Sequence, residues 1–213
     1  MTHPGIHGLY AITDPALIPD RQLLPFAEAA LRGGARLLQY RDKTATSEQR
    51  RQRASQLQAL CRQHGALFLV NDDPTLAADI DADGVHIGQS DGGITRARRL
   101  LGPGKIIGVT CHSDLTLAEQ AAAAGADYVA FGRFFPSRTK PQAPPADLAI
   151  LHQARQRLTI PLVAIGGVDA DNGCQLLAQG ADALAVIHAL FSHQAPEQIE
   201  QAARRLTALF NPA

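Results

Sequence analysis

The chain has 213 residues, of which 46% are hydrophobic and 19% are charged, a composition that suits one globular domain and excludes disordered and fibrous proteins. Its 20 basic residues balance its 20 acidic residues, so no overall charge attracts nucleic acid or a membrane surface. Because residues 1–8 lack the pattern of a secretory leader and no stretch of about 18 residues is apolar, we expect a cytoplasmic protein whose partners are small molecules.

Short apolar runs rich in β-forming residues alternate with helix-length stretches along the whole chain. The runs predict eight strands, at Gly8–Thr13, Arg36–Tyr40, Leu67–Val70, Gly84–His86, Ile106–Val109, Tyr128–Phe131, Leu162–Ile165 and Ala183–Ile187. This order predicts an α/β protein with a single (βα)8 TIM barrel domain over residues 1–213. An open doubly wound sheet is the alternative architecture.

The clearest helix is predicted at Ser47–His64. Thr46 and Gln49 form a capping-box pattern at its start, and Gly65 stops it. Other helices are predicted at residues 114–124 and 171–179, and the last one begins near Pro196.

An internal repeat supports the barrel. Small residues with Ala or Asp precede each even-numbered strand, at Gly34-Ala35, Asp81-Ala82-Asp83, Gly125-Ala126-Asp127 and Gly180-Ala181-Asp182. Each interval fits two βα units, so the sequence predicts four similar quarters of a closed barrel.

Polar or glycine residues follow every predicted strand, and in a βα barrel these positions share the rim that carries the active site. The most informative segment is Gln39-Tyr40-Arg41-Asp42-Lys43. Alternate residues of an extended chain point the same way, so Gln39, Arg41 and Lys43 are expected to form an oxyanion clamp while Tyr40 and Asp42 face elsewhere. We include all five in the expected substrate-binding set; a solvated charged loop is the alternative.

Hard oxygen ligands follow the third and fourth predicted strands. Asn71 and Asp72 end one strand and Asp91 follows the next, and such oxygens suit Mg²⁺ that also keeps water and substrate phosphate as ligands. Asp72 and Asp91 are therefore the predicted metal ligands. In the alternative interpretation, Asp73 only begins a helix and Asp91 only occupies a glycine turn.

Three segments on the later strands complete the rim. The loop Ser137-Arg138-Thr139-Lys140-Pro141 is stiffened by prolines and suits substrate recognition. Gly166-Gly167 and Val186-Ile187-His188 lie where many βα barrels bind phosphate through backbone N–H groups. A surface crossover and a tight turn are the alternatives for the loop and for the glycine pair.

The cysteine pattern indicates no disulfide framework and no zinc site, because Cys61, Cys111 and Cys174 are odd in number and widely spaced. We expect Cys111, beside Thr110, to be a small apolar filler. His86 is expected to be held by a hydrogen bond near the rim.

Taken in order, these motifs closely resemble the thiamine phosphate synthase family. The segments that carry the resemblance are Leu9–Asp14, Gln39–Lys43, Asn71-Asp72, Asp83–Asp91, Gly108–Thr110, Phe131-Gly132, Thr139–Pro141 and Ala164–Val168.

The resemblance implies a transferase of thiamine biosynthesis that moves the hydroxymethylpyrimidine group from its diphosphate to the ring nitrogen of hydroxyethylthiazole phosphate. It also implies that Asp72 and Asp91 bind Mg²⁺ and that the reaction needs no protein nucleophile. The implied contacts of the pyrimidine diphosphate are Gln39, Arg41, Lys43, Asn71, Thr110 and Lys140, of which Arg41, Lys43, Thr110 and Lys140 are expected to be catalytic. The implied contacts of the thiazole phosphate are Ser137, Thr139, Gly167 and the backbone at Ile187-His188.

The chain departs from the family pattern where Thr110 and His188 replace common serines and Ser137-Arg138-Thr139 replaces Thr-Pro-Thr. Arg138 and His188 add cationic donors near the thiazole phosphate. A thiazole tautomerase is one alternative, against which retention of Gln39, Arg41, Lys43, Asp72, Asp91 and Lys140 favours the synthase. A noncatalytic phosphate-ligand sensor is the other alternative, and it would bind ligand without turnover. The sequence leaves the oligomeric state open, a homo-oligomer included.

Overall fold

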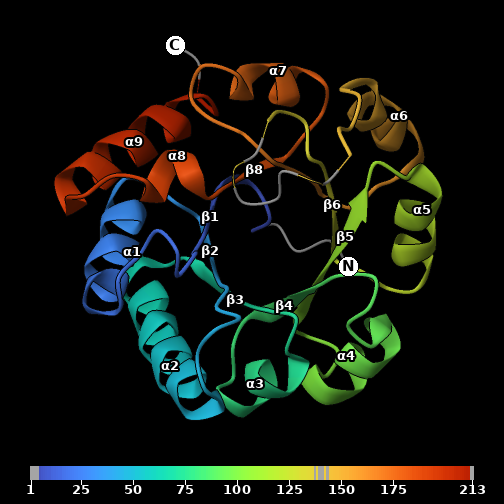
Figure 1. Ribbon diagram of the computed structural model, residues 1–213. Coiled ribbons are helices and arrows are strands. Elements are labelled where there is room, and N and C mark those ends of the chain that lie inside the picture. The colour runs from blue at the N-terminus through green and yellow to red at the C-terminus, as the bar shows by residue number, and fades with distance from the viewer. Residues whose placement is uncertain (1–4, 137, 139–141, 143, 212–213) are drawn as a thin grey trace.

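The chain forms a closed barrel of parallel strands inside a ring of helices (Figure 1). The computed structural model describes residues 5–136, 138, 142 and 144–211. Within these residues, eight strands pair in chain order, and β1 also pairs with β8. That last pairing closes the sheet, so the predicted TIM barrel is confirmed and the open doubly wound sheet is wrong.

The elements alternate regularly along the chain. The strands are β1 Gly8–Ile12, β2 Leu37–Tyr40, β3 Leu67–Asn71, β4 Gly84–Ile87, β5 Ile106–His112, β6 Tyr128–Phe131, β7 Leu162–Ile165 and β8 Ala183–Val186. The helices are η1 Asp20–Gln22, α1 Leu23–Arg32, α2 Ser47–His64, α3 Pro74–Asp79, α4 Gly93–Leu101, α5 Leu115–Ala123, α6 Ala149–Arg157, α7 Gly173–Ala178, α8 His188–Phe191 and α9 Pro196–Ala208. In the described part of the chain, no helix is both long enough and apolar enough to cross a membrane.

The predicted boundaries mostly lie close to the observed ones. Helix α2 has the predicted limits, with both capping-box hydrogen bonds between Thr46 and Gln49 and a left-handed Gly65 at its end. Strand β5 is the exception, because it continues three residues beyond the predicted end at Val109 to His112. The pairing with β6 shifts register between Thr110 and His112, and this irregularity lets the strand carry polar residues that the sequence placed in a loop.

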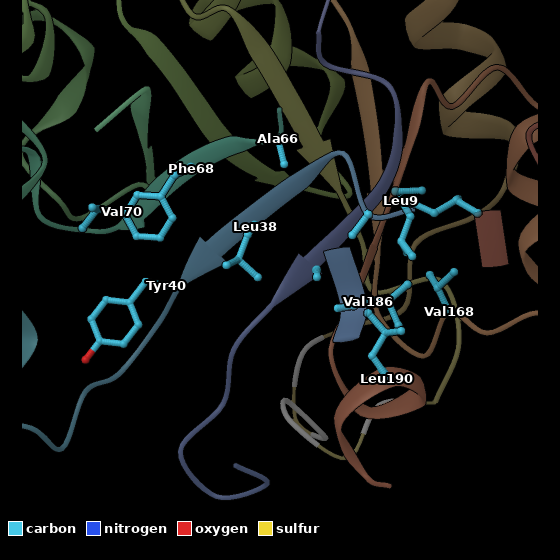
Figure 2. Close-up of a cluster of buried hydrophobic side chains, with 14 of the residues drawn as sticks. Leu9, Leu38, Tyr40, Ala66, Phe68, Val70, Val168, Val186 and Leu190 are labelled. Atoms are coloured by element: carbon cyan, nitrogen blue, oxygen red, sulfur yellow. The ribbon is translucent and has the colours of Figure 1, made fainter. Parts of the chain in front are cut away.

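Two hydrophobic layers follow from the alternation of side chains along the strands. The inner layer fills the barrel and consists of Ile6, Tyr10, Ile12, Leu37, Leu69, Ile106, Tyr128, Ala130, Val163, Ala183 and Ala185. The outer layer lies between the strands and the helices, and Figure 2 shows part of it, including Leu9, Leu38 and Phe68. Residues that point inward near the C-terminal ends of the strands are therefore the ones that can form a site.

The sequence repeat has a structural role at the end of the barrel where the strands begin. In three of the four quarters, an aspartate before an even-numbered strand accepts a hydrogen bond from a backbone N–H near the start of the preceding strand. The pairs are Asp83 with Phe68, Asp127 with Ile107 and Asp182 with Leu162, at 2.8, 2.8 and 2.7 Å. Each carboxylate thus satisfies a backbone donor at a strand end.

Replacing Asp127 with alanine is expected to lower the free energy of unfolding by about 2 kcal/mol, because it removes charge-assisted hydrogen bonds from a largely buried carboxylate. Asp127 Oδ2 accepts from Ile107 N at 2.8 Å and from Arg98 Nη2 at 2.6 Å. Urea unfolding measures the change. Asp171→Ala is the control, since its side chain is 88% exposed and lies 3.5 Å from Arg205, and it should change stability by no more than about 0.5 kcal/mol. Equal losses in both variants would contradict this role of Asp127.

Candidate active site

A cavity of about 520 Å³ opens at the C-terminal ends of the strands, a size that suits a small-molecule site. It brings together most of the residues that the sequence indicated: Gln39, Arg41, Lys43, Asn71, Asp72, Asp91, Thr110, Arg138, Gly167, Ile187 and His188. These residues come from β2, β3, β5 and the segments that follow β2, β3, β4, β6, β7 and β8. The closed barrel therefore converts groups dispersed over the chain into one site.

Strand β2 and the segment after it supply Gln39 and two of the cations that line the cavity. Gln39 points inward, and Arg41 and Lys43 follow at alternate positions, so all three line the cavity. The backbone of Arg41 is held by Thr13, the residue after β1, because its N–H donates to Thr13 Oγ1 at 2.9 Å and its carbonyl accepts from the same hydroxyl at 3.3 Å. The Arg41 guanidinium lies 3.9 Å from Asp14 Oδ2. The segment after β2 thus presents a guanidinium and an ammonium to the same cavity, and such groups can bind phosphate oxygens.

The structure does not support the expected substrate contacts of Tyr40 and Asp42, because neither side chain lines the cavity. Tyr40 belongs to the outer layer with Phe68 and Val70 (Figure 2). Asp42 accepts hydrogen bonds from Thr44 N at 2.9 Å and from Arg53 Nη1 at 2.8 Å. The cause is the strand alternation itself, which directs these two residues away from Gln39 and Arg41.

Two carboxylates, Asp72 and Asp91, lie together beside Lys43 in the cavity. Asp72 interacts directly with Asp91, and its Oδ2 lies 2.9 Å from Lys43 Nζ. Burial opposes ionisation of Asp72, but hydrogen bonds from Lys43 and Asn71 and the positive charge of Lys43 outweigh it and lower the pKa of Asp72 below its usual value. The carboxylate is therefore ionised at neutral pH, which suits a cation ligand.

The backbone at Asp72 has an unusual conformation, with a φ of 63° in a region that favours glycine. Its N–H donates to the His86 carbonyl at 2.8 Å and ties the end of β3 to β4. Strained backbone of this kind persists where the surrounding structure enforces it, and it is common at functional sites. The conformation directs the Asp72 side chain into the cavity.

Both alternatives for the acidic segments are partly correct. Asp73 is the N-cap of α3 and accepts from Leu76 N at 2.9 Å, so it is a structural residue. Asp91 Oδ2 accepts from Gly88 N at 2.7 Å, which closes the turn after β4. Asp91 also lines the cavity, so its role in the turn and its position beside Asp72 coexist. In the described residues, no group of three or more His, Cys, Asp or Glu side chains could hold a metal ion, so a cation here would need oxygens from substrate or water.

A continuous row of hydrogen-bonded side chains joins four residues of the cavity lining, Gln39, Tyr10, His86 and Thr110, through the buried Tyr128. Gln39 Nε2 donates to Tyr10 OH at 2.6 Å, and Tyr10 OH lies 2.9 Å from Tyr128 OH. His86 Nδ1 lies 2.8 Å from Tyr128 OH, and His86 Nε2 lies 2.8 Å from Thr110 Oγ1. The expectation that a hydrogen bond holds His86 is confirmed, and both of its ring nitrogens are engaged.

The far side of the cavity consists of the segments after β6, β7 and β8. Gly167 has a φ of 68°, and a Cβ atom on it would lie 2.5 Å from the Pro136 carbonyl oxygen. Only glycine fits this close approach of two backbone segments. Arg138, Ile187 and His188 line the same side, whereas Ser137, Thr139 and Lys140 lie outside the described residues.

Several residues that line the cavity lie outside the predicted site, among them Tyr10, Arg133 and Asp169. Tyr10 lies inside β1 rather than after it, so it lacks the signal that marks the other site residues, which is a position after a predicted strand. Arg133 lies two residues after the end of β6 at Phe131 and lines the cavity, so its place after a strand was an available signal. Asp169 follows the glycine pair and also lines the cavity.

Cys111 lies outside the cavity lining and is fully buried in the outer layer. Burial, with a smaller effect of the Asp114 charge, raises the pKa of its thiol to about 12. The thiol therefore stays protonated at neutral pH, and the predicted role as an apolar filler is confirmed.

Known proteins resemble this chain over almost its whole length. A family model described as thiamine monophosphate synthase matches residues 9–190. The chain belongs to the thiamine monophosphate synthase family. It is 67% identical over 205 residues to the thiamine-phosphate synthase of Alcanivorax borkumensis, an alignment that covers 96% of this chain and 94% of that protein. The thiamine-phosphate synthase of Thioalkalivibrio sulfidiphilus is 52% identical over 212 residues, with 99% of each chain covered.

A solved structure gives the same result for the family fold. The thiamine phosphate pyrophosphorylase from Pyrococcus furiosus is 34% identical, superposes with a TM-score of 0.86 and covers 96% of both chains. Together with the sequence relatives, it confirms the prediction of a transferase of thiamine biosynthesis built on a TIM barrel.

Proposed function

We propose that the cavity joins hydroxymethylpyrimidine diphosphate to hydroxyethylthiazole phosphate and releases thiamine phosphate and pyrophosphate. The observation that carries this proposal is the position of Arg41 and Lys43 beside the Asp72 and Asp91 carboxylates within one cavity. A diphosphate leaving group needs cationic donors, and a divalent cation that it shares with the protein needs carboxylate oxygens. Both sets of groups are present on neighbouring strands.

In the proposed reaction, the bond between the pyrimidine methylene carbon and the diphosphate oxygen breaks, and its electron pair leaves with the diphosphate. The ring nitrogen of the thiazole then supplies its lone pair to form the new bond to that methylene carbon. Arg41 and Lys43 stabilise the negative charge that gathers on the diphosphate. Lys140, outside the described residues, is proposed to act on the same group.

The donor set fits Mg²⁺, because Asp72 and Asp91 provide two hard carboxylate oxygen ligands with room in the cavity for substrate oxygens. When bound, Mg²⁺ supplies positive charge that stabilises the departing diphosphate. Asp72 stays ionised for this purpose because its hydrogen-bond partners lower its pKa.

We assign the two substrates to different sides of the cavity. The side made by β2 to β5 carries Gln39, Arg41, Asn71 and Thr110 and suits the pyrimidine diphosphate. The side made by the segments after β6, β7 and β8 carries Gly167, Arg138 and His188 and suits the phosphate of the thiazole. Ser137 and Thr139 are proposed to join this second side.

The proposal is tested by incubating the purified chain with both phosphorylated substrates and Mg²⁺ and measuring thiamine phosphate and pyrophosphate. We expect both products in equal amounts, and omission of Mg²⁺ should stop their formation. Isomerisation of a thiazole precursor without these products would indicate a tautomerase, and ligand binding without turnover would indicate a sensor. Either result would overturn the proposed function.

A further inference from the structure

The row of hydrogen bonds between Gln39 and Thr110 can run in one of two directions, because each hydroxyl has a single proton. Burial raises the pKa of Tyr10 and of Tyr128 well above the usual value, so both side chains remain phenols. Each phenol that accepts a hydrogen bond on its oxygen therefore donates its own proton to the next partner. One donor at the end of the row fixes all the others.

Gln39 provides that donor. Its Nε2 donates to Tyr10 OH at 2.6 Å, so the Tyr10 proton goes to Tyr128 OH at 2.9 Å. The Tyr128 proton then goes to His86 Nδ1 at 2.8 Å. An imidazole that accepts at Nδ1 carries its proton at Nε2, and this N–H donates to Thr110 Oγ1 at 2.8 Å. The Thr110 hydroxyl, which already accepts, keeps its own proton for another partner.

We propose that this row is directed from Gln39 to Thr110, and that Tyr128 is a positioning residue that leaves the Thr110 hydroxyl as a donor toward the departing diphosphate. The identity of that acceptor rests on the proposed function. No proton crosses the row, which acts only by fixing the orientation of each hydroxyl. Such preorganised donors need no reorientation when charge develops.

The barrel is built to hold Tyr128 in this position. Tyr128 is fully buried and pairs in register with Gly108 on β5. A Cβ atom on Gly108 would lie 1.9 Å from Tyr128 Cζ, so only glycine leaves space for the ring. The His86 ring stacks on the Tyr128 ring with centroids 5.5 Å apart. The phenol is therefore fixed between its two hydrogen-bond partners.

The direction is tested first by the tautomer of His86. In ¹⁵N-histidine-labelled protein, a long-range ¹H–¹⁵N spectrum distinguishes a proton on Nε2 from one on Nδ1, and the His86 signals are assigned by their loss in His86→Gln. We expect a neutral ring protonated on Nε2. A ring protonated on Nδ1, or on both nitrogens, would overturn the proposal, because Tyr128 could then not donate to it.

The role of Tyr128 is tested by a double-mutant cycle with Thr110. We expect Tyr128→Phe to lower kcat by about tenfold, the effect of losing one donor in the transition state. In a Thr110→Val background the same change should cost less than about twofold. If the loss of kcat in the double variant equalled the product of the losses in the two single variants, the proposal would be overturned, because Tyr128 would then act independently of Thr110.

A matched control uses Thr116→Val, since Thr116 is exposed on α5 and lies outside the cavity. In that background Tyr128→Phe should keep its full tenfold effect. If Tyr128→Phe fails to fold, Tyr10→Phe breaks the row at the preceding link and enters the same cycle. The tautomer is measured on the unmodified chain without substrate, so an incorrect direction is distinguishable from absence of the proposed activity, which the product assay reports.

Discussion

Replacing Asp72 with asparagine is expected to lower the Mg²⁺-dependent rate of thiamine phosphate formation by about 100-fold. Asparagine has nearly the same shape and tolerates the left-handed backbone at this position, where φ is 63°. The change therefore removes the charge without adding strain. Because Asp72 interacts with Asp91 and with Lys43, loss of its charge weakens the cation site and leaves the diphosphate charge less stabilised.

The measurement is the initial rate over a range of Mg²⁺ concentrations, which gives both the maximal rate and the concentration for half-maximal activation. We expect the second value to rise in Asp72→Asn. Asp79→Asn is the matched control, since Asp79 lies at the end of α3, pairs with Arg51 at 3.0 Å and is outside the cavity. An unchanged Mg²⁺ dependence in Asp72→Asn would remove Asp72 from the proposed metal site.

The series of strands and helices was predictable because it depends on signals that each segment carries by itself, whereas closure rests on the pairing of β1 with β8. Apolar runs, glycine stops and the capping box at Thr46 define the βα units locally. The end of β5 was not predictable, since Thr110 and His112 are polar and the strand continues only through a register shift against β6. That shift is a property of the pairing of two strands, and one strand alone does not reveal it.

The site was predictable to the extent that its residues follow strand ends. Strand alternation correctly separates the inward Gln39 from the outward Tyr40, whereas the prediction that all five residues of the segment contact substrate is too broad, because Tyr40 and Asp42 lie outside the cavity lining. Tyr10 and Tyr128 were not found, because tyrosine inside a strand looks like an ordinary core residue. Their function depends on register, which places Tyr128 opposite Gly108 and beside His86.

Replacing Arg41 with lysine is expected to lower kcat and kcat/KM for the pyrimidine diphosphate by about 100-fold each. Lysine retains the positive charge but lacks the planar fork that holds two phosphate oxygens at once. The backbone of Arg41 is fixed by two hydrogen bonds with Thr13, at 2.9 and 3.3 Å. A shift of the backbone therefore cannot compensate for the N–H donors that lysine lacks. Because the diphosphate charge increases as its bond breaks, the loss should affect the transition state more than substrate binding.

Steady-state kinetics with each substrate varied in turn separates these effects. The same kcat with a raised KM would show that Arg41 only binds the ground state, contrary to its proposed role at the departing diphosphate. Arg157→Lys is the matched control, since Arg157 is 58% exposed and pairs with Glu119 at 3.2 Å on the outer surface. Its kinetics should stay within about twofold of the unmodified chain. Both variants make the same chemical replacement. A loss of kcat and kcat/KM confined to Arg41→Lys would therefore show that catalysis depends on the guanidinium geometry inside the cavity.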